Sequence, residues 1–285
     1  MAFIRSVLHL LFMVVTLIPW ATAVLIARLF VRGDQLYGAC RRWLKLSVDS
    51  GTLLLGIHNR VSGTEHLPQP GDDTPTLLLV KHQSTWETFS MAAVMPRPLA
   101  FVFKRELLYI PFFGWVMGAM DMIYIDRSKG VQAFRKLVTA GKRQLRMGKW
   151  IIMFPEGTRT RRGEAGDYKS GGARLAVACG AQIIPIAVTS AKCWPKGAFV
   201  KKPGIVDISI GPPIAAAGRS ADDLNKEVAH WIESEMRRLD PEAYVGQPPL
   251  PPYVRLSKAE LRAARQAERE AQAGEDAPAA AQESA

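Results

Sequence analysis

Short apolar runs alternate with helix-type segments over most of this chain, and this alternation constrains its fold more than any other feature. Buried strands are predicted at residues 76–80, 100–104, 122–125, 151–154, 183–189 and 206–210. Helical patterns occupy residues 85–95, 131–147, 171–179 and 221–239. Strands and helices that alternate in this way predict an α/β domain with a largely parallel central sheet flanked by helices.

Polar side chains follow two of these apolar runs. His82 and Glu87 come directly after residues 76–80, and Glu156 to Arg159 come directly after residues 150–154. Because the carboxyl ends of parallel strands meet at one edge of a sheet, we expect both groups to lie in one active site. A neutral imidazole beside a carboxylate is a common device for deprotonating a hydroxyl, so His82 and Glu87 are the predicted catalytic residues.

The spacing of His82 and Glu87 also predicts their local structure. Five residues on a regular helix would leave the two side chains about 140° apart and out of contact. We therefore expect His82 to precede the helix, with Ser84 or Thr85 capping the first turn. Glu87 then reaches back to the imidazole, fixes its tautomer and stabilises its protonated form.

These motifs resemble a known family. A His-x4-Asp sequence followed some seventy residues later by Phe-Pro-Glu-Gly-Thr-Arg is the signature of the glycerolipid acyltransferases. The bacterial 1-acylglycerol-3-phosphate acyltransferases look most similar. Residues 154–159 match the second motif completely, whereas Glu87 stands where the family mostly has Asp. The resemblance covers roughly residues 64–213 and implies a glycerol-3-phosphate acyltransferase-like fold with membrane-docked amino-terminal helices.

The predicted substrate-binding residues follow from chemistry and from the resemblance. The Arg159 guanidinium is a forked donor suited to phosphate, and the Glu156 carboxylate is a candidate to hold the acceptor glycerol. A glycine is needed where the backbone turns sharply or approaches substrate. The resemblance implies that Arg127 lies near the acceptor phosphate and that Lys104 adds charge to the same pocket. The full predicted set is Lys104, Arg127, Glu156, Gly157, Thr158 and Arg159.

The implied reaction transfers a fatty acyl group from acyl-CoA or acyl carrier protein to 1-acylglycerol-3-phosphate, forming phosphatidic acid. The chain has no Gly-x-Ser-x-Gly sequence and no cysteine beside His82, so we expect direct transfer without an acyl-enzyme. Alternatives are another lysolipid acceptor such as lyso-ornithine lipid, hydrolysis with water as acceptor, and a non-catalytic lipid-binding protein. We expect no cofactor, and no metal site, because one His and one Glu supply too few ligands.

The charge of the chain favours anionic partners. Its formal net charge is +11, which suits membrane phospholipids, lysophosphatidic acid, acyl-CoA and acyl carrier protein. Nucleic acid is not expected as a partner, because the chain has no nucleic-acid motif. Cys40, Cys179 and Cys193 have no metal or redox spacing, so we expect reduced thiols in a cytosol-facing protein.

The amino-terminal segment carries no formal charge over residues 6–27. Such a segment is a spanning or hairpin anchor, a helix lying in the membrane plane, or a cleaved signal peptide ending near Ala23. Apolar residues continue past Ala23, which argues against cleavage. Basic residues are more numerous after the segment than before it, so we expect the catalytic domain to face the cytoplasm. The resemblance to the bacterial enzymes implies the bacterial inner membrane.

The organisation predicted for the whole chain has three parts. Residues 1–62 form membrane-anchoring helices, and residues 63–245 form the α/β acyltransferase domain. Residues 246–285 form a proline-rich linker and a polar, partly disordered tail.

Overall fold

A computed structural model describes residues 1–126, 130–255 and 260. Within it, Met1–Leu250 forms one compact unit, distinct from the residues that follow. The α-helices of this unit are α1 (Ala2–Ala27), α2 (Asp34–Ser50), α3 (Trp86–Val94), α4 (Phe113–Ala119), α5 (Gly130–Arg146), α6 (Gly171–Cys179) and α7 (Ala221–Leu239). Short helical turns continue α2 at Gly51–Leu55 and follow β3 at Arg105–Tyr109.

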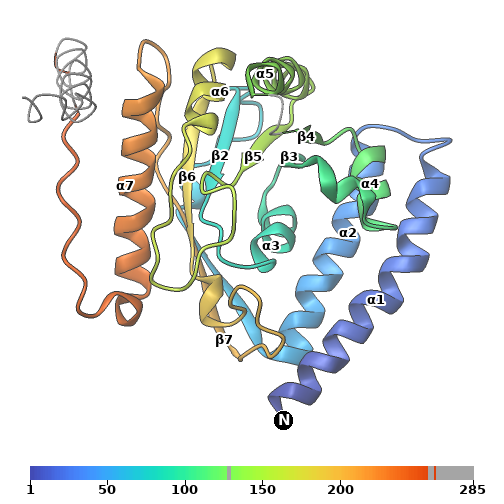
Figure 1. Ribbon diagram of the computed structural model, residues 1–285. Coiled ribbons are helices and arrows are strands. Elements are labelled where there is room, and N and C mark those ends of the chain that lie inside the picture. Colours follow the sequence, from blue (N-terminus) through green and yellow to red (C-terminus); the bar gives the residue numbers. More distant parts are fainter. Residues whose placement is uncertain (127–129, 256–259, 261–285) are drawn as a thin grey trace, which may run out of the picture. The chain divides into compact units, whose positions relative to one another are not determined.

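A single sheet runs through the unit (Figure 1). Its strands are β1 (Ile57–Ser62), β2 (Thr76–Val80), β3 (Leu99–Lys104), β4 (Ile123–Ile125), β5 (Trp150–Met153), β6 (Gln182–Val188) and β7 (Gly204–Ile210). The strand order is β1-β7-β6-β2-β5-β3-β4, and β6 and β7 form its antiparallel pair. The other neighbours are parallel, which confirms the predicted fold class.

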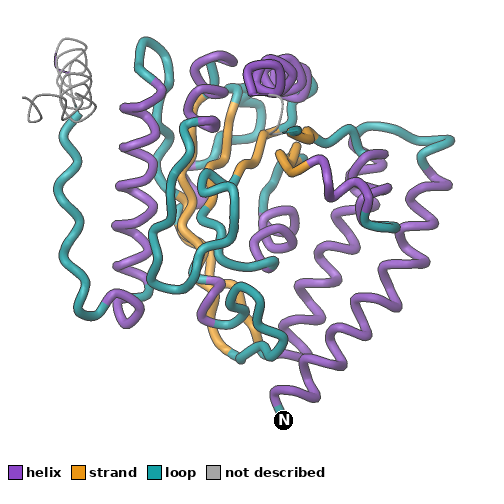
Figure 2. Tube along the Cα trace, in the orientation of Figure 1, coloured by secondary structure: helices purple, strands orange, loops and turns teal. Residues whose placement is uncertain are grey.

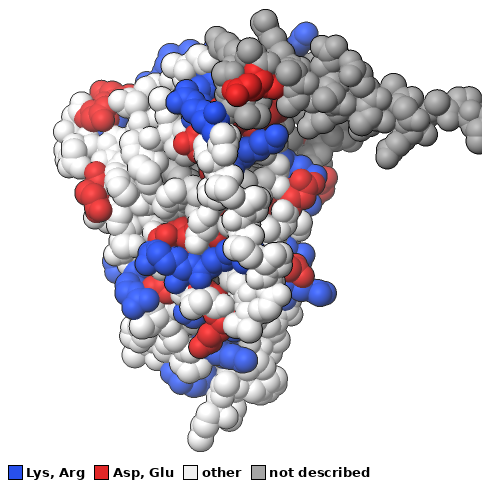
Figure 3. Space-filling model, turned by 90° about the vertical axis from the view of Figure 1, so that its left-hand side faces the viewer, with Lys and Arg blue, Asp and Glu red and all other residues white. Residues whose placement is uncertain are grey.

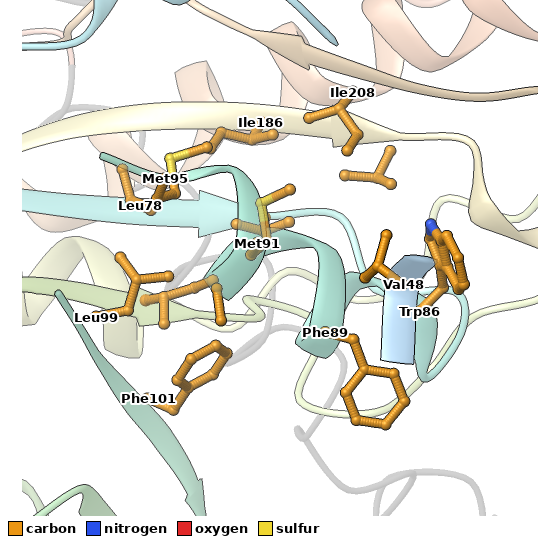
Figure 4. Close-up of a cluster of buried hydrophobic side chains, with 14 of the residues drawn as sticks. Val48, Leu78, Trp86, Phe89, Met91, Met95, Leu99, Phe101, Ile186 and Ile208 are labelled. Atoms are coloured by element: carbon orange, nitrogen blue, oxygen red, sulfur yellow. The ribbon is translucent and has the colours of Figure 1, made fainter. Parts of the chain in front are cut away.

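Both faces of the sheet are covered by helices, as Figure 2 shows. Leu77, Leu78 and Leu79 of β2 are all fully buried, because successive side chains of a strand point to opposite faces. Leu78 joins a core with residues of α2, α3 and α4, while Leu77 and Leu79 join a second core with α5, α6 and α7. Figure 4 shows the first core, with Met95, the residue after α3, against Leu78. A central strand buried on both faces places its carboxyl end between two layers of helices.

Two elements were not anticipated from the sequence. Strand β1 lies inside the range expected to hold anchoring helices, and it pairs with β7 at the edge of the sheet. Its side chains alternate between buried and exposed, so its sequence lacks a continuous apolar run. Helix α4 is short and contains two glycines, which weakens its helical pattern. The division of the chain at residues 62 and 245 stays a prediction.

Helix α1 is long and apolar enough to cross a membrane by length and composition, and no other helix of the described chain is. It nevertheless contacts the body at both of its ends. Near its start, Ser6 Oγ accepts from the Lys201 amide at 2.9 Å, and at its end Arg28 Nε donates to the Ala119 carbonyl at 3.0 Å. Trp20 Nε1 donates to the Ala39 carbonyl of α2 at 2.9 Å. The face of α1 that points away from the body exposes large apolar side chains, among them Ile4, Leu8, Leu11 and Val15.

Charged side chains on the α7 side of the unit lie beside charges of the opposite sign (Figure 3). Arg162 pairs with Asp240 at 2.7 Å, and Arg238 pairs with Glu235 at 2.5 Å. Cations that are paired in this way do not form a patch of one charge for an anionic partner.

Candidate active site

His82 lies just beyond the carboxyl end of β2, beside the end of β5. Its imidazole stacks on the Phe154 ring, with centroids 4.0 Å apart and planes inclined by 18°. Strands β2 and β5 are parallel neighbours, with Leu79 opposite Met153. This pairing brings the two polar motifs, some seventy residues apart in the chain, to one edge of the sheet.

Glu87 reaches back beneath the start of α3. Its carboxylate is fully buried and accepts from the Gln83 amide at 2.7 Å and the Ser84 amide at 3.0 Å. Ser190, which follows β6, donates its hydroxyl to the same carboxylate at 2.5 Å. Ser84 Oγ accepts from the Trp86 amide at 3.0 Å, so Ser84 and Glu87 together resemble a capping box.

The imidazole and the carboxylate face each other without a closed hydrogen bond. His82 Nδ1 lies 3.9 Å from Glu87 Oε2, and this buried nitrogen has no hydrogen-bond partner among the described residues. A small shift would close this gap, as is common when catalytic hydrogen bonds tighten on substrate binding. With Nδ1 directed at Glu87, Nε2 is the nitrogen left to accept a proton.

Burial sets the charge states of the pair. Burial, together with the nearby Arg159 and Lys196 charges, lowers the pKa of His82 to about 3, so the imidazole is neutral near pH 7. Burial raises the pKa of Glu87 to about 7, opposed by the hydrogen bonds from Ser190 and from the amides at the start of α3. An ionised Glu87 that closes on Nδ1 would strengthen His82 as a base.

The Glu156 carboxylate lies under the His82 main chain. Its Oε1 accepts from the His82 amide at 3.1 Å and lies 3.4 Å from Lys81 Nζ, and its side chain is only 1% exposed. Burial raises the pKa of Glu156 to about 7, opposed by the Lys81 charge. Thr160 donates its amide to the His82 carbonyl at 2.8 Å. The acceptor-binding role expected of Glu156 stays a prediction, and this burial argues against it.

The rest of the second motif turns outward to the surface. Gly157 has a φ of 67°, a left-handed conformation that favours glycine. Thr158 and Arg159 are exposed. Arg159 Nη1 donates to Thr85 Oγ1 at 3.0 Å, which holds the guanidinium beside the start of α3. A forked cation therefore lies beside the start of α3, near enough to His82 for its charge to lower the pKa of the imidazole.

Another predicted binding residue, Lys104, is not brought into contact with His82. Lys104 ends β3, is exposed, and is separated from β2 by β5. Arg127 lies outside the described residues. Over residues 1–126, 130–255 and 260, no group of three or more His, Cys, Asp or Glu side chains could hold a metal ion. The absence of a metal and of a cofactor stays a prediction.

Three residues that contact the motifs, directly or through Lys81, were not predicted from the sequence. Lys81 is a single charged residue directly after an apolar strand, and this position is the signal by which it could have been identified. Ser190 and Glu233 carry no local signal, because they lie more than a hundred residues from the groups that they contact.

Several known proteins are similar to this chain in sequence. The acyltransferase family model matches residues 58–189. The 1-acyl-sn-glycerol-3-phosphate acyltransferase of Pseudomonas aeruginosa is 36% identical over 242 residues, which cover 84% of this chain and 92% of that protein. The alpha form of 1-acyl-sn-glycerol-3-phosphate acyltransferase from Mus musculus is 29% identical, over 64% of this chain and 63% of its own length.

A solved structure agrees at the level of the fold. The 1-acyl-sn-glycerophosphate (LPA) acyltransferase PlsC from Thermotoga maritima aligns with a TM-score of 0.69 at 23% identity, covering 84% of this chain and 98% of that chain. The match in sequence to the Pseudomonas enzyme extends over nearly the whole of that protein. This chain therefore belongs to the glycerolipid acyltransferase family and is an acyltransferase.

Proposed function

We propose that this protein acylates the free hydroxyl of 1-acylglycerol-3-phosphate, using acyl-CoA or acyl carrier protein as donor, and so forms phosphatidic acid. The observation that carries the proposal is the neutral, half-buried His82 with its Nδ1 directed at the buried Glu87 carboxylate. The Pseudomonas relative, named as a 1-acyl-sn-glycerol-3-phosphate acyltransferase, supports the choice of acceptor.

In the proposed mechanism, His82 Nε2 takes the proton of the acceptor hydroxyl while Glu87 holds Nδ1–H and stabilises the imidazolium. The hydroxyl oxygen attacks the thioester carbonyl carbon, and a C–O bond forms. The C–S bond then breaks, and the leaving thiolate takes the proton from the imidazolium. No residue forms a covalent acyl intermediate, and the reaction requires no cofactor.

The oxyanion needs donors other than the amides at the start of α3 and at Gly157. The Gln83 and Ser84 amides at the start of α3 are bound by Glu87, and the Gly157 amide donates to the Phe154 carbonyl. These amides are engaged in structure and are poorly placed to stabilise negative charge on the thioester oxygen. We therefore assign no amide of this group to the oxyanion.

In the proposed complex, the acceptor phosphate binds at the exposed end of the second motif. Arg159 offers two parallel N–H donors there, and Gly157 and Thr158 provide a backbone that a phosphate can approach closely. Arg127 and Lys104 would add charge to the same site, as the family resemblance implies.

We further propose that α1 lies in the plane of the bacterial inner membrane, with the catalytic unit on the cytoplasmic side. The hydrogen bonds of Ser6 and Arg28 hold both ends of α1 against the body, so a perpendicular span would draw the body into the lipid. The outward face of α1 suits burial at the boundary between headgroups and acyl chains. This placement presents the active site to lysolipids in the same membrane.

The test is acyl transfer by membranes that contain the protein, with labelled acyl-CoA or acyl carrier protein and 1-acylglycerol-3-phosphate. His82→Ala should lower the rate by about 10²–10⁴. His58→Ala, at an exposed residue of edge strand β1, is the matched control and should keep the wild-type rate. Release of free fatty acid, or transfer to lyso-ornithine lipid without transfer to 1-acylglycerol-3-phosphate, would overturn the proposed acceptor.

A further inference from the structure

A fully buried lysine lies directly beside the candidate base in the chain. Lys81 Nζ donates to Glu233 Oε1 at 2.6 Å and to the carbonyls of Glu164 at 3.0 Å and Ala165 at 2.7 Å. These three contacts satisfy the three donors of an ammonium group. They connect the end of β2 to α7 and to the loop between β5 and α6, elements that lie side by side in Figure 1.

A fourth contact links this lysine to His82. Glu156 Oε1 lies 3.4 Å from Lys81 Nζ, and the same oxygen accepts from the His82 amide at 3.1 Å. One carboxylate oxygen therefore touches both the buried cation and the main chain of the candidate base. Lys81 itself is fully buried, so it has no open face toward substrate.

The charges of this cluster are unequal. One ammonium serves two buried carboxylates, and Glu156 Oε2 and Glu233 Oε2 have no hydrogen-bond partner among the described residues. Tyr168 donates its hydroxyl to Glu233 Oε1 at 2.7 Å and brings no charge. A buried carboxylate without a countercharge takes up a proton, so Lys81 is the group that favours ionised Glu156.

We propose that Lys81 is a positioning residue for His82, acting through Glu156: the ammonium holds the carboxylate, and the carboxylate fixes the His82 main chain. The role assigned to His82 rests on the proposed function, whereas the positioning itself does not. It follows that Glu156 positions His82, the candidate base.

The argument predicts that Lys81 and Glu156 act as one unit. Lys81→Met should lower kcat by about 10²-fold, the loss expected when a reacting group is displaced by about 1 Å, while the acceptor KM changes little. Glu156→Gln keeps the side-chain shape and removes the charge, and it should give the same split between kcat and KM. The double variant should be no slower than the slower single variant.

Lys149→Met is the matched control. Lys149 is also buried, but it directly precedes β5, whereas Glu156 follows the other end of that strand. It should keep the wild-type kcat. If Lys81→Met does not fold, the double variant Lys81→Met with Glu233→Gln is used in its place. This double variant also removes the negative charge that Lys81 would otherwise neutralise. Recovery of wild-type kcat in that pair would show that Lys81 serves stability alone and would overturn the proposal.

A readout without substrate separates this inference from the proposed function. Diethyl pyrocarbonate modifies accessible neutral imidazoles, and mass spectrometry follows His82 with the exposed His58 as internal reference. Lys81→Met and Glu156→Gln should both increase the rate at His82 relative to His58. Unchanged His82 reactivity in both variants would refute the positioning, even if wild-type protein proves inactive toward 1-acylglycerol-3-phosphate.

Discussion

Replacement of Glu87 by Asp should impair this enzyme, although Asp is the residue that the family mostly has at this position. The Glu87 carboxylate is held by the Ser190 hydroxyl from beyond β6 and by two amides at the start of α3. An aspartate carboxylate would lie about 1.5 Å nearer to its own backbone, the length of one carbon–carbon bond. It cannot keep the Ser190 contact and the amide contacts together.

The magnitude follows from the groups that are lost. Removing one buried methylene costs about 0.8 kcal/mol, and losing one hydrogen bond to a charged group costs about 1.5–3 kcal/mol. The free energy of unfolding should therefore fall by about 2–4 kcal/mol. Displacement of the carboxylate from His82 Nδ1 should lower kcat by about 10²-fold.

Urea unfolding in detergent and initial rates of acyl transfer measure the two effects. Glu65→Asp, at an exposed residue before β2, is the matched control and should change neither. Ser190→Ala should lower the unfolding free energy by the contribution of the hydrogen bond alone, because it leaves the Glu87 methylene in place. A Glu87→Asp protein with wild-type kcat and wild-type unfolding free energy would refute the claim that the length of the Glu87 side chain is required.

Because burial raises the pKa of Glu87 and Glu156 to about 7, kcat/KM should rise as pH increases through about 7, when the carboxylates ionise. The unfolded carboxyls ionise first, near 4.5, so each buried group should reduce the unfolding free energy by about 3 kcal/mol between pH 4.5 and 7. In urea titrations, Glu87→Gln should lose less unfolding free energy over this pH range than the wild type. Equal losses in the two proteins would contradict the burial argument. Arg159→Ala should raise the acceptor KM by about tenfold or more with kcat little changed, and an unchanged KM would exclude its phosphate contact. Gly51→Ala places a Cβ 2.5 Å from Trp86 Cζ3 and should cost about 1–3 kcal/mol in thermal or urea unfolding; wild-type stability would show that the Trp86 ring moves freely.

Local sequence patterns were sufficient to predict most of the sheet and to indicate a candidate site at its edge. Helices α6 and α7 and strand β2 have the predicted bounds, because each is a continuous periodic or apolar segment between turn residues. The meeting of His82 and Glu156 followed from a general property of parallel strands. Edge strand β1 was missed because only one side of it is buried, so its sequence alternates and resembles a loop.

The contacts between charged groups around the site could not be predicted from local sequence patterns. Nothing near Lys81 in the sequence indicates that its ammonium meets Glu233, which lies 152 residues later on α7. The same holds for Ser190, whose hydroxyl reaches Glu87 only because β6 lies beside β2 in the sheet.

The sequence by itself thus determined the α/β class and the apolar amino-terminal helix, and it indicated the candidate catalytic residues, since these depend on periodicity and on side-chain type within one segment. The tertiary structure decided which groups hold these residues in place. It buried Lys81, Glu87 and Glu156 together, and it engaged the amides at the start of α3. Burial and contact between distant segments depend on strand order and on helix packing, and no single segment of the chain specifies either.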